Sequence, residues 1–139
     1  MTRSFLIGLL AALFLAACDP RFIYESNLSP REIQALRGTW EGQSALSRSD
    51  ERDCPEFYVW VFRVAGGNVE GDLVDRATPN APHTRFTTFL DYDGSITVLA
   101  RPGGRDMTVR GAFQRESFVG EAKARTCSYL LRLRRTSSS

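Results

Sequence analysis

The sequence has little of what metal centres and nucleophilic catalysis require. It contains one histidine, His83, and three cysteines. Metal sites in proteins usually combine several His or Cys ligands, and Ser-His-Asp chemistry needs a histidine held between a serine and a carboxylate. His83 follows the proline-containing segment 79–82, which predicts an exposed loop, and no G-x-S-x-G pattern, phosphate loop or dinucleotide fingerprint occurs. We therefore expect a protein without enzymatic activity, metal or cofactor.

An excess of charge of one sign is also missing. The 18 basic and 16 acidic residues leave a net charge of +2, and neither sign forms a block. Nucleic-acid binding depends largely on clustered Lys and Arg side chains. The balance therefore argues against a nucleic-acid partner, and the sequence shows no polybasic segment that would attract a membrane.

No apolar run is long enough to span a bilayer, which takes roughly 20 residues. The run from Phe5 to Ala17 follows the positive charge of Arg3, an order typical of an export signal. It ends in Leu15-Ala16-Ala17-Cys18, which resembles the bacterial lipobox. An ordinary secretory signal with a chance cysteine is the alternative.

The lipobox resemblance implies removal of residues 1–17 and attachment of lipid to Cys18. The protein would then be anchored in the bacterial cell envelope by its lipid, with its domain in the periplasm. Asp19 follows the lipidated position, as in the inner-membrane retention signal of some enteric bacteria, which favours the inner over the outer membrane. We expect residues 18–28 to form the lipidated N-terminus and tether, residues 29–135 one folded domain, and residues 136–139 a disordered tail.

With Cys18 assigned to lipid, Cys54 and Cys127 are left to form a disulfide. Disulfides persist in the compartments that exported proteins reach. A bridge that closes a loop of roughly 70 residues stabilises a fold by about 4 kcal/mol in the chain-entropy description. We expect a structural cross-link, because neither a C-x-x-C spacing nor a neighbouring histidine indicates a reactive thiol.

Helix-start signals coincide at the beginning of the domain. Ser29 is a candidate N-cap, Pro30 suits the first helical position, and Glu32 is placed to complete a capping box. Leu28 and Ile33 have the spacing of a hydrophobic staple. The pattern predicts a short helix over residues 30–37 that ends at Gly38.

After Gly38 the sequence has the alternation of β-strands, interrupted by Gly-, Pro- and Asp-rich turns. Eight strands are expected, over residues 39–46, 56–64, 68–74, 85–92, 95–101, 106–114, 117–125 and 128–134. Alternate residues form one face almost without charge, and a sheet this long buries such a face by curling on itself. We predict an all-β protein: an eight-stranded antiparallel up-and-down barrel, preceded by one short helix. Cys54 and Cys127 would then lie at the same end of the barrel, although a two-sheet sandwich could also bring them together.

The inward-facing set contains both large rings and very small residues. Inner glycines fit the bends or bulges that closure of a barrel needs, and small residues would leave space for a ligand only where rings do not fill it. The residues that could line a ligand pocket are Trp40, Gly71, Phe86, Tyr92, Gly111, Phe113, Gly120, Ala122 and Tyr129.

The strand over residues 56–64 departs from the alternation, because both of its faces are apolar. Either the N-terminal helix covers its outer face, which we favour, or that face is exposed for a partner or the membrane. The candidate interaction patch consists of Phe57, Tyr58, Trp60 and Phe62.

Gly38-Thr39-Trp40, which opens the first strand after a short helix, resembles the Gly-x-Trp motif of the calycins, the group of small barrels that includes lipocalins and avidins. The resemblance implies that Arg132, Arg134 or Arg135 stacks on Trp40 and closes one end of the barrel, while a ligand enters at the other. The chain is also similar to small periplasmic barrel inhibitors of secreted metalloproteases, which combine an early Gly-x-Trp strand with a disulfide.

These observations leave three hypotheses for the function. The first is a non-catalytic envelope lipoprotein whose barrel mediates protein interaction or has a structural role, since a fold alone does not specify an activity. The second is a carrier of a small apolar ligand inside the barrel. The third is a periplasmic protein similar to the protease inhibitors.

Overall fold

The computed structural model describes residues 24–49, 54–78 and 80–138. The predicted signal peptide, Cys18 and Asp19 lie outside the described residues, so their processing and lipidation stay predictions. Within the described residues, no helix has the length and apolar character needed to cross a membrane.

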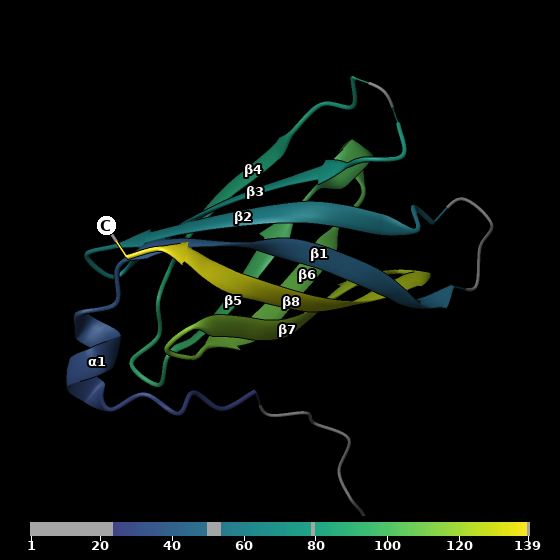
Figure 1. Ribbon diagram of the computed structural model, residues 1–139. Coiled ribbons are helices and arrows are strands. Elements are labelled where there is room, and N and C mark those ends of the chain that lie inside the picture. Colours follow the sequence, from purple (N-terminus) through teal and green to yellow (C-terminus); the bar gives the residue numbers. More distant parts are fainter. Residues whose placement is uncertain (1–23, 50–53, 79, 139) are drawn as a thin grey trace, which may run out of the picture.

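The described residues form one eight-stranded antiparallel sheet that curls into a nearly closed barrel (Figure 1). Strands that follow each other along the chain pair, except β4 and β5, and β1 also pairs with β8, which gives the order β4-β3-β2-β1-β8-β7-β6-β5. At the seam, β4 and β5 approach each other without forming a ladder among the described residues. The predicted all-β up-and-down architecture is confirmed. The strands are β1 Gly38–Ser49, β2 Phe57–Ala65, β3 Asn68–Asp75, β4 Thr84–Phe89, β5 Ser95–Ala100, β6 Met107–Phe113, β7 Ser117–Ala124 and β8 Cys127–Ser137.

The single α-helix among the described residues, α1, spans Pro30–Gln34 and begins as predicted. The backbone N–H of Glu32 donates to Ser29 Oγ at 3.3 Å, and the Ser29 N–H donates to Glu32 Oε2 at 2.7 Å, which completes the capping box. The prediction that the helix continues to residue 37 is wrong. The chain leaves it at Ala35, so that Leu36 joins the barrel core.

Gly38 therefore begins β1 and does not cap the helix. Its φ of +134° is a conformation that L side chains rarely adopt, and a Cβ built on it would lie 2.0 Å from the backbone oxygen of Ser137. The glycine is thus required where the first strand starts beside the last residues of β8.

The two ends of the barrel differ in what closes them. The end that we call the helix end carries α1 and the β2–β3, β4–β5 and β6–β7 turns. The opposite end, the disulfide end, carries the β3–β4 loop, a 3-10 turn η1 (Pro102–Gly104) and the bond between Cys54 and Cys127, whose Cα atoms are 5.9 Å apart. The predicted disulfide is confirmed, at one end of the barrel as the topology required.

The folded domain extends further than the sequence indicated at both ends. Thr136 and Ser137, predicted as part of a disordered tail, belong to β8, because Thr136 Oγ1 donates to the Thr39 backbone oxygen at 3.3 Å and Ser137 lies opposite Thr39. Residues 25–27, predicted as part of the tether, are hydrogen-bonded to Phe113 and Gln114 at the end of β6.

Candidate functional site

Aromatic rings fill the interior of the barrel. Phe62 and Phe118 have ring centres 4.9 Å apart, Phe113 and Phe118 4.8 Å, and Trp40 and Phe113 5.0 Å. Such edge-on and tilted contacts are the arrangements that aromatic pairs prefer. The structure thus brings Trp40 and Phe113, two of the candidate pocket residues, together, but in direct contact.

The inner glycines leave no room for a ligand either. A Cβ on Gly71 would lie 2.0 Å from Cζ of Phe86, so the ring of Phe86 occupies the space over the glycine. Gly111 and Gly120 face each other across β6 and β7, and a Cβ on either would meet a backbone oxygen within 2.6 Å. Bends at glycines were expected, but the register shifts of the described β1–β8 pair lie between Thr39 and Trp40 and between Leu46 and Arg48. The inner glycines instead permit close packing.

Ala122 and Tyr129 are buried in the same core cluster, whereas Tyr92 is not. Tyr92 was expected to face inward, but its side chain is 92 % exposed. Strand β4 ends at Phe89, and the Gly94 N–H donates to the Asp91 backbone oxygen at 2.9 Å, which places Tyr92 in the turn between β4 and β5. Its place in the candidate pocket is therefore wrong.

The one buried polar residue of the described core, Ser44, is fully satisfied. Its Oγ accepts hydrogen bonds from Nε1 of Trp60 at 2.8 Å and from the backbone N–H of Tyr58 at 3.3 Å. A buried hydroxyl without such partners would be costly, so Ser44 is explained by structure and offers no free group for chemistry.

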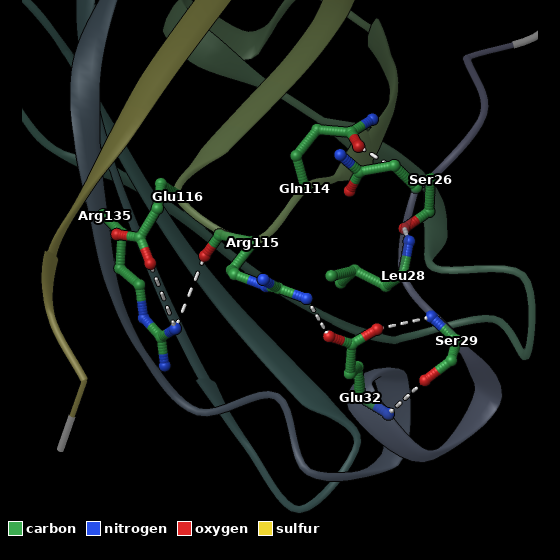
Figure 2. Close-up of polar contacts among 9 residues, drawn as sticks. Ser26, Leu28, Ser29, Glu32, Gln114, Arg115, Glu116 and Arg135 are labelled. Carbon is green, nitrogen blue, oxygen red and sulfur yellow. Dashed lines mark hydrogen bonds and ion pairs between the residues drawn. The ribbon is translucent and has the colours of Figure 1, made fainter.

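Trp40 and Arg135 close the helix end. The guanidinium of Arg135 lies over the Trp40 ring, and the same side chain donates to the backbone oxygens of Arg37 and Arg115. Of the three arginines that the calycin resemblance proposed for this role, the structure selects Arg135, because it continues the inward-facing alternation of β8. Glu116 lies 4.0 Å from its Nη1 (Figure 2).

The segment that precedes α1 is fixed to the end of β6. Ser26 Oγ donates to the Phe113 backbone oxygen at 2.5 Å, and the Gln114 side chain donates to the Glu25 backbone oxygen at 2.6 Å and accepts from the Asn27 N–H at 2.8 Å. Figure 2 shows this group beside the ion pair between Arg115 and Glu32. The hydrogen bond from the Ser29 backbone, followed by Arg115, lowers the pKa of Glu32 below its ordinary value.

The disulfide end holds a pocket of about 230 Å³. Its floor is formed by Tyr58 and Leu73, and Asp75 and Arg105 bring opposite charges to its edge. Burial raises the pKa of Tyr58 above its ordinary value. Tyr129 lies beneath, with its hydroxyl donating to the Pro55 backbone oxygen at 2.8 Å. The remaining lining residues are Pro55, Thr78, Ala81, Pro82, Thr84, Pro102 and Gly103.

Most of the candidate interaction patch lies on the inner face of β2 and not on its outer face. Tyr58, Trp60 and Phe62 are buried in the core, and only Phe57 of the proposed patch is turned outward. The favoured alternative is wrong as well, because α1 lies at the helix end and not over β2 (Figure 1). The outward side chains form an apolar group that we call the outer patch, exposed at Ala45 of β1 and half-buried at Phe57, Val59 and Val61 of β2 and at Val74 of β3.

His83 lies on the surface beside β3. Its Nδ1 is 2.6 Å from Oδ1 of Asp72, whose other oxygen is 3.4 Å from Nε of Arg85. Within the described residues, no group of three His, Cys, Asp or Glu side chains could hold a metal ion. The His83–Asp72 contact joins the β3–β4 loop to β3.

Comparison of the chain with protein-family models, with curated proteins and with solved structures gives no match. The strand order, the short N-terminal helix and the Trp40–Arg135 contact are consistent with a lipocalin-like fold. The contacts of Ser26 and Gln114 carry no sequence signal, because they join residues about 90 positions apart through ordinary polar side chains.

Proposed function

We propose that this chain is a lipid-anchored, non-catalytic protein of the bacterial cell envelope whose barrel binds another envelope protein through the outer patch. The observation that carries the proposal is the distribution of apolar side chains. Inside, rings contact one another and occupy the space over the glycines; outside, three consecutive outward positions of β2 are Phe57, Val59 and Val61. Contiguous apolar side chains on a surface are typical of interaction sites.

The location rests on the lipobox resemblance of Leu15-Ala16-Ala17-Cys18. The domain would lie in the periplasm, with Asp19 favouring the inner membrane. The Cys54–Cys127 bond supports this location, since disulfides persist in oxidising compartments.

The register extends the outer patch across neighbouring strands. Phe57 lies opposite Ala45 on one side of the β1–β2 ladder, and Val59 lies opposite Val74 in the β2–β3 ladder. Side chains directly opposite in adjacent strands are close enough to touch, so these residues form one surface. A partner that presents apolar side chains to this surface would remove it from water.

Fewer observations support the hypothesis that the barrel carries a small apolar ligand. The interior that it needs is occupied, and the pocket over Tyr58 at the disulfide end, at about 230 Å³, is smaller than the roughly 300–1,000 Å³ of most ligand sites. Two larger hollows, of about 570 and 620 Å³, are not lined by the aromatic residues of the core. The inhibitor hypothesis requires a free N-terminal segment for insertion into a protease, whereas residues 25–27 bind their own barrel. We therefore favour protein interaction.

The test places a photo-crosslinking amino acid at Val59 of the full-length protein in cells, with Thr87 on the outer face of β4 as the matched control position. We expect a single defined adduct from Val59 and none from Thr87. Phe57→Ser should abolish the adduct and leave the melting temperature unchanged. Equal adducts at both positions, or loss of folding in Phe57→Ser, would contradict the proposed interface. Cys18→Ser tests the anchor separately, because it should release the protein from the membrane fraction.

A further inference from the structure

The balanced charge of the sequence is distributed unevenly over the barrel wall. On β1–β4 the outward-facing charges cancel, with three arginines, Arg48, Arg63 and Arg85, against Glu41, Glu70 and Asp72. On β5–β8 the outward-facing charges are four basic side chains and one acidic side chain, that of Glu121, which gives a net charge of +3. We call these four residues, Arg110, Lys123, Arg132 and Arg134, the basic wall; all four are exposed.

The strand register brings these charges onto one continuous surface. Arg110 of β6 lies opposite Glu121 of β7, which also pairs with Lys123 at 3.5 Å. Arg132 and Arg134 follow on β8, opposite Val119 and Ser117. On its other side Arg134 lies opposite Glu41 of β1, so two acidic residues lie among the four cations, and a net charge of +2 is left for an external anion.

The N-terminal segment runs over the same wall. From Ser26, bonded to the end of β6, the chain reaches Tyr24, whose pKa is raised by burial and then by the nearby carboxylate of Glu121 on β7. Ala112, which faces outward between these points, is only 1 % exposed. Figure 1 shows the segment passing from α1 beneath β7.

The number of residues between Cys18 and Tyr24 limits the distance between the wall and the lipid. Cys18 precedes Tyr24 by six residues, and an extended chain covers at most about 3.6 Å per residue, so the anchor lies within roughly 20 Å of Tyr24. Electrostatic attraction is screened over about 8 Å at physiological salt. A barrel held this closely can bring the basic wall into that range.

Two exposed leucines flank the basic residues. Leu99 on β5 is 48 % exposed and Leu130 on β8 is 55 % exposed, both on outward-facing positions. Basic side chains beside exposed apolar ones suit the interface of a bilayer, where cations meet headgroup phosphates and apolar groups enter the acyl boundary.

We propose that the basic wall lies against the anionic phospholipid headgroups of the membrane in which the protein is anchored. The inference rests on the proposed lipid anchor at Cys18. It orients the barrel: β7 faces the bilayer, and β3, across the barrel from it in the strand order, faces the periplasm. The outer patch then lies between the two sides and meets the edge of the wall where Ala45 is opposite Leu130. Anchor and wall act together, since one flexible attachment alone leaves a domain free to rotate.

The test uses the full-length lipidated protein in vesicles that contain phosphatidylglycerol and a quencher-labelled phospholipid. A fluorophore is placed through Thr108→Cys on the outer face of β6 or, as the matched control, through Thr87→Cys on β4. We expect quenching of the label at 108 and little quenching at 87. The difference should vanish in vesicles of phosphatidylcholine and at high salt.

Charge-reversal variants distinguish an effect of the basic wall from an effect of the protein's overall charge. Arg110→Glu with Arg132→Glu should equalise the quenching of the two labels, because each basic side chain at an anionic surface changes partitioning roughly fivefold. Arg63→Glu with Arg85→Glu, on β2 and β4, should leave the difference intact. If the unmutated protein floats with the vesicles but both labels are quenched equally, the proposed orientation is wrong and the lipid anchor is still supported. The same conclusion follows if the difference in quenching persists in vesicles without anionic lipid. Protein that does not float overturns the anchor and this inference with it.

Discussion

The guanidinium carbon of Arg135 lies 5.1 Å from the centre of the Trp40 ring, and this contact joins the first strand of the barrel to the last. The Arg135 side chain is only 18 % exposed, and it also donates to the backbone oxygen of Arg37, just before β1, and to that of Arg115 in the β6–β7 turn. One side chain therefore ties together the segment after α1, the β6–β7 turn and the end of β8.

Replacing Arg135 should weaken the barrel measurably. A cation over an indole contributes about 1–2 kcal/mol when it is largely desolvated, so we expect Arg135→Ala to lower the free energy of unfolding by at least that amount in urea titrations. Arg134→Ala is the matched control, because Arg134 is exposed on the outer face and its loss should change stability by less than about 0.5 kcal/mol. Equal effects of the two substitutions would contradict a closing role for Arg135.

Adding one methyl group at Gly71 should disturb the core. The new Cβ would lie 2.0 Å from the Phe86 ring, and overpacking of this kind costs about 1–3 kcal/mol. In a Phe86→Ala background the same substitution should cost much less, since the ring is gone. A double-mutant cycle measures this coupling, and additive effects would show that the ring does not occupy the space over the glycine.

Stability should fall in acid in a way that Glu32 partly controls. The hydrogen bond from the Ser29 backbone and the Arg115 guanidinium hold the pKa of Glu32 below its ordinary value of 4.5. A carboxyl with a lowered folded pKa stabilises the fold fully above its unfolded pKa, and this contribution is lost as the pH falls through the folded value. The stability difference between the wild type and Glu32→Gln should therefore be largest at neutral pH and shrink below about pH 4.5. A stability difference that is the same at all pH values would contradict this role of Glu32.

Reduction of the disulfide should destabilise the domain. The Cys54–Cys127 bond joins positions 73 residues apart, and loss of such a bond from a small domain typically costs about 2–5 kcal/mol. A reductant should lower the urea midpoint of the wild type to that of the Cys54→Ser, Cys127→Ser variant, and it should not affect the variant. A midpoint that is unchanged by reduction would show that the bond adds nothing to stability.

The sequence predicts the strands well because their signal is local. Inward and outward residues alternate within each strand, so the eight strands and the uncharged inner face can be found without knowledge of the contacts. The start of α1 is equally local, since Ser29 and Glu32 form its capping box within one turn. The disulfide was predicted because the lipobox resemblance assigned Cys18 to lipid, which left only Cys54 and Cys127 to pair.

The errors arise where contacts between distant residues decide the structure. Alternation continues through Tyr92, but the Leu90 N–H donates to the Gly67 backbone oxygen at 2.8 Å and the chain then turns at residues 91–94. Strand β2 is apolar on both faces, and its own pattern cannot say which face is inside. The docking of Ser26 on β6 depends on packing that no local pattern records.

Pairing of β1 with β8 also has a consequence for biosynthesis. A ribosome makes Thr39 almost a hundred residues before Ser137, the residue that lies opposite it in the β1–β8 ladder. Until β8 is translated, β1 can pair on only one side, with β2, and the nascent chain exposes an open sheet edge. Pairings between such distant residues form slowly, and an open edge invites pairing with other chains. Completion of the barrel therefore waits for β8, whose loss would leave both β1 and β7 with an unpaired edge.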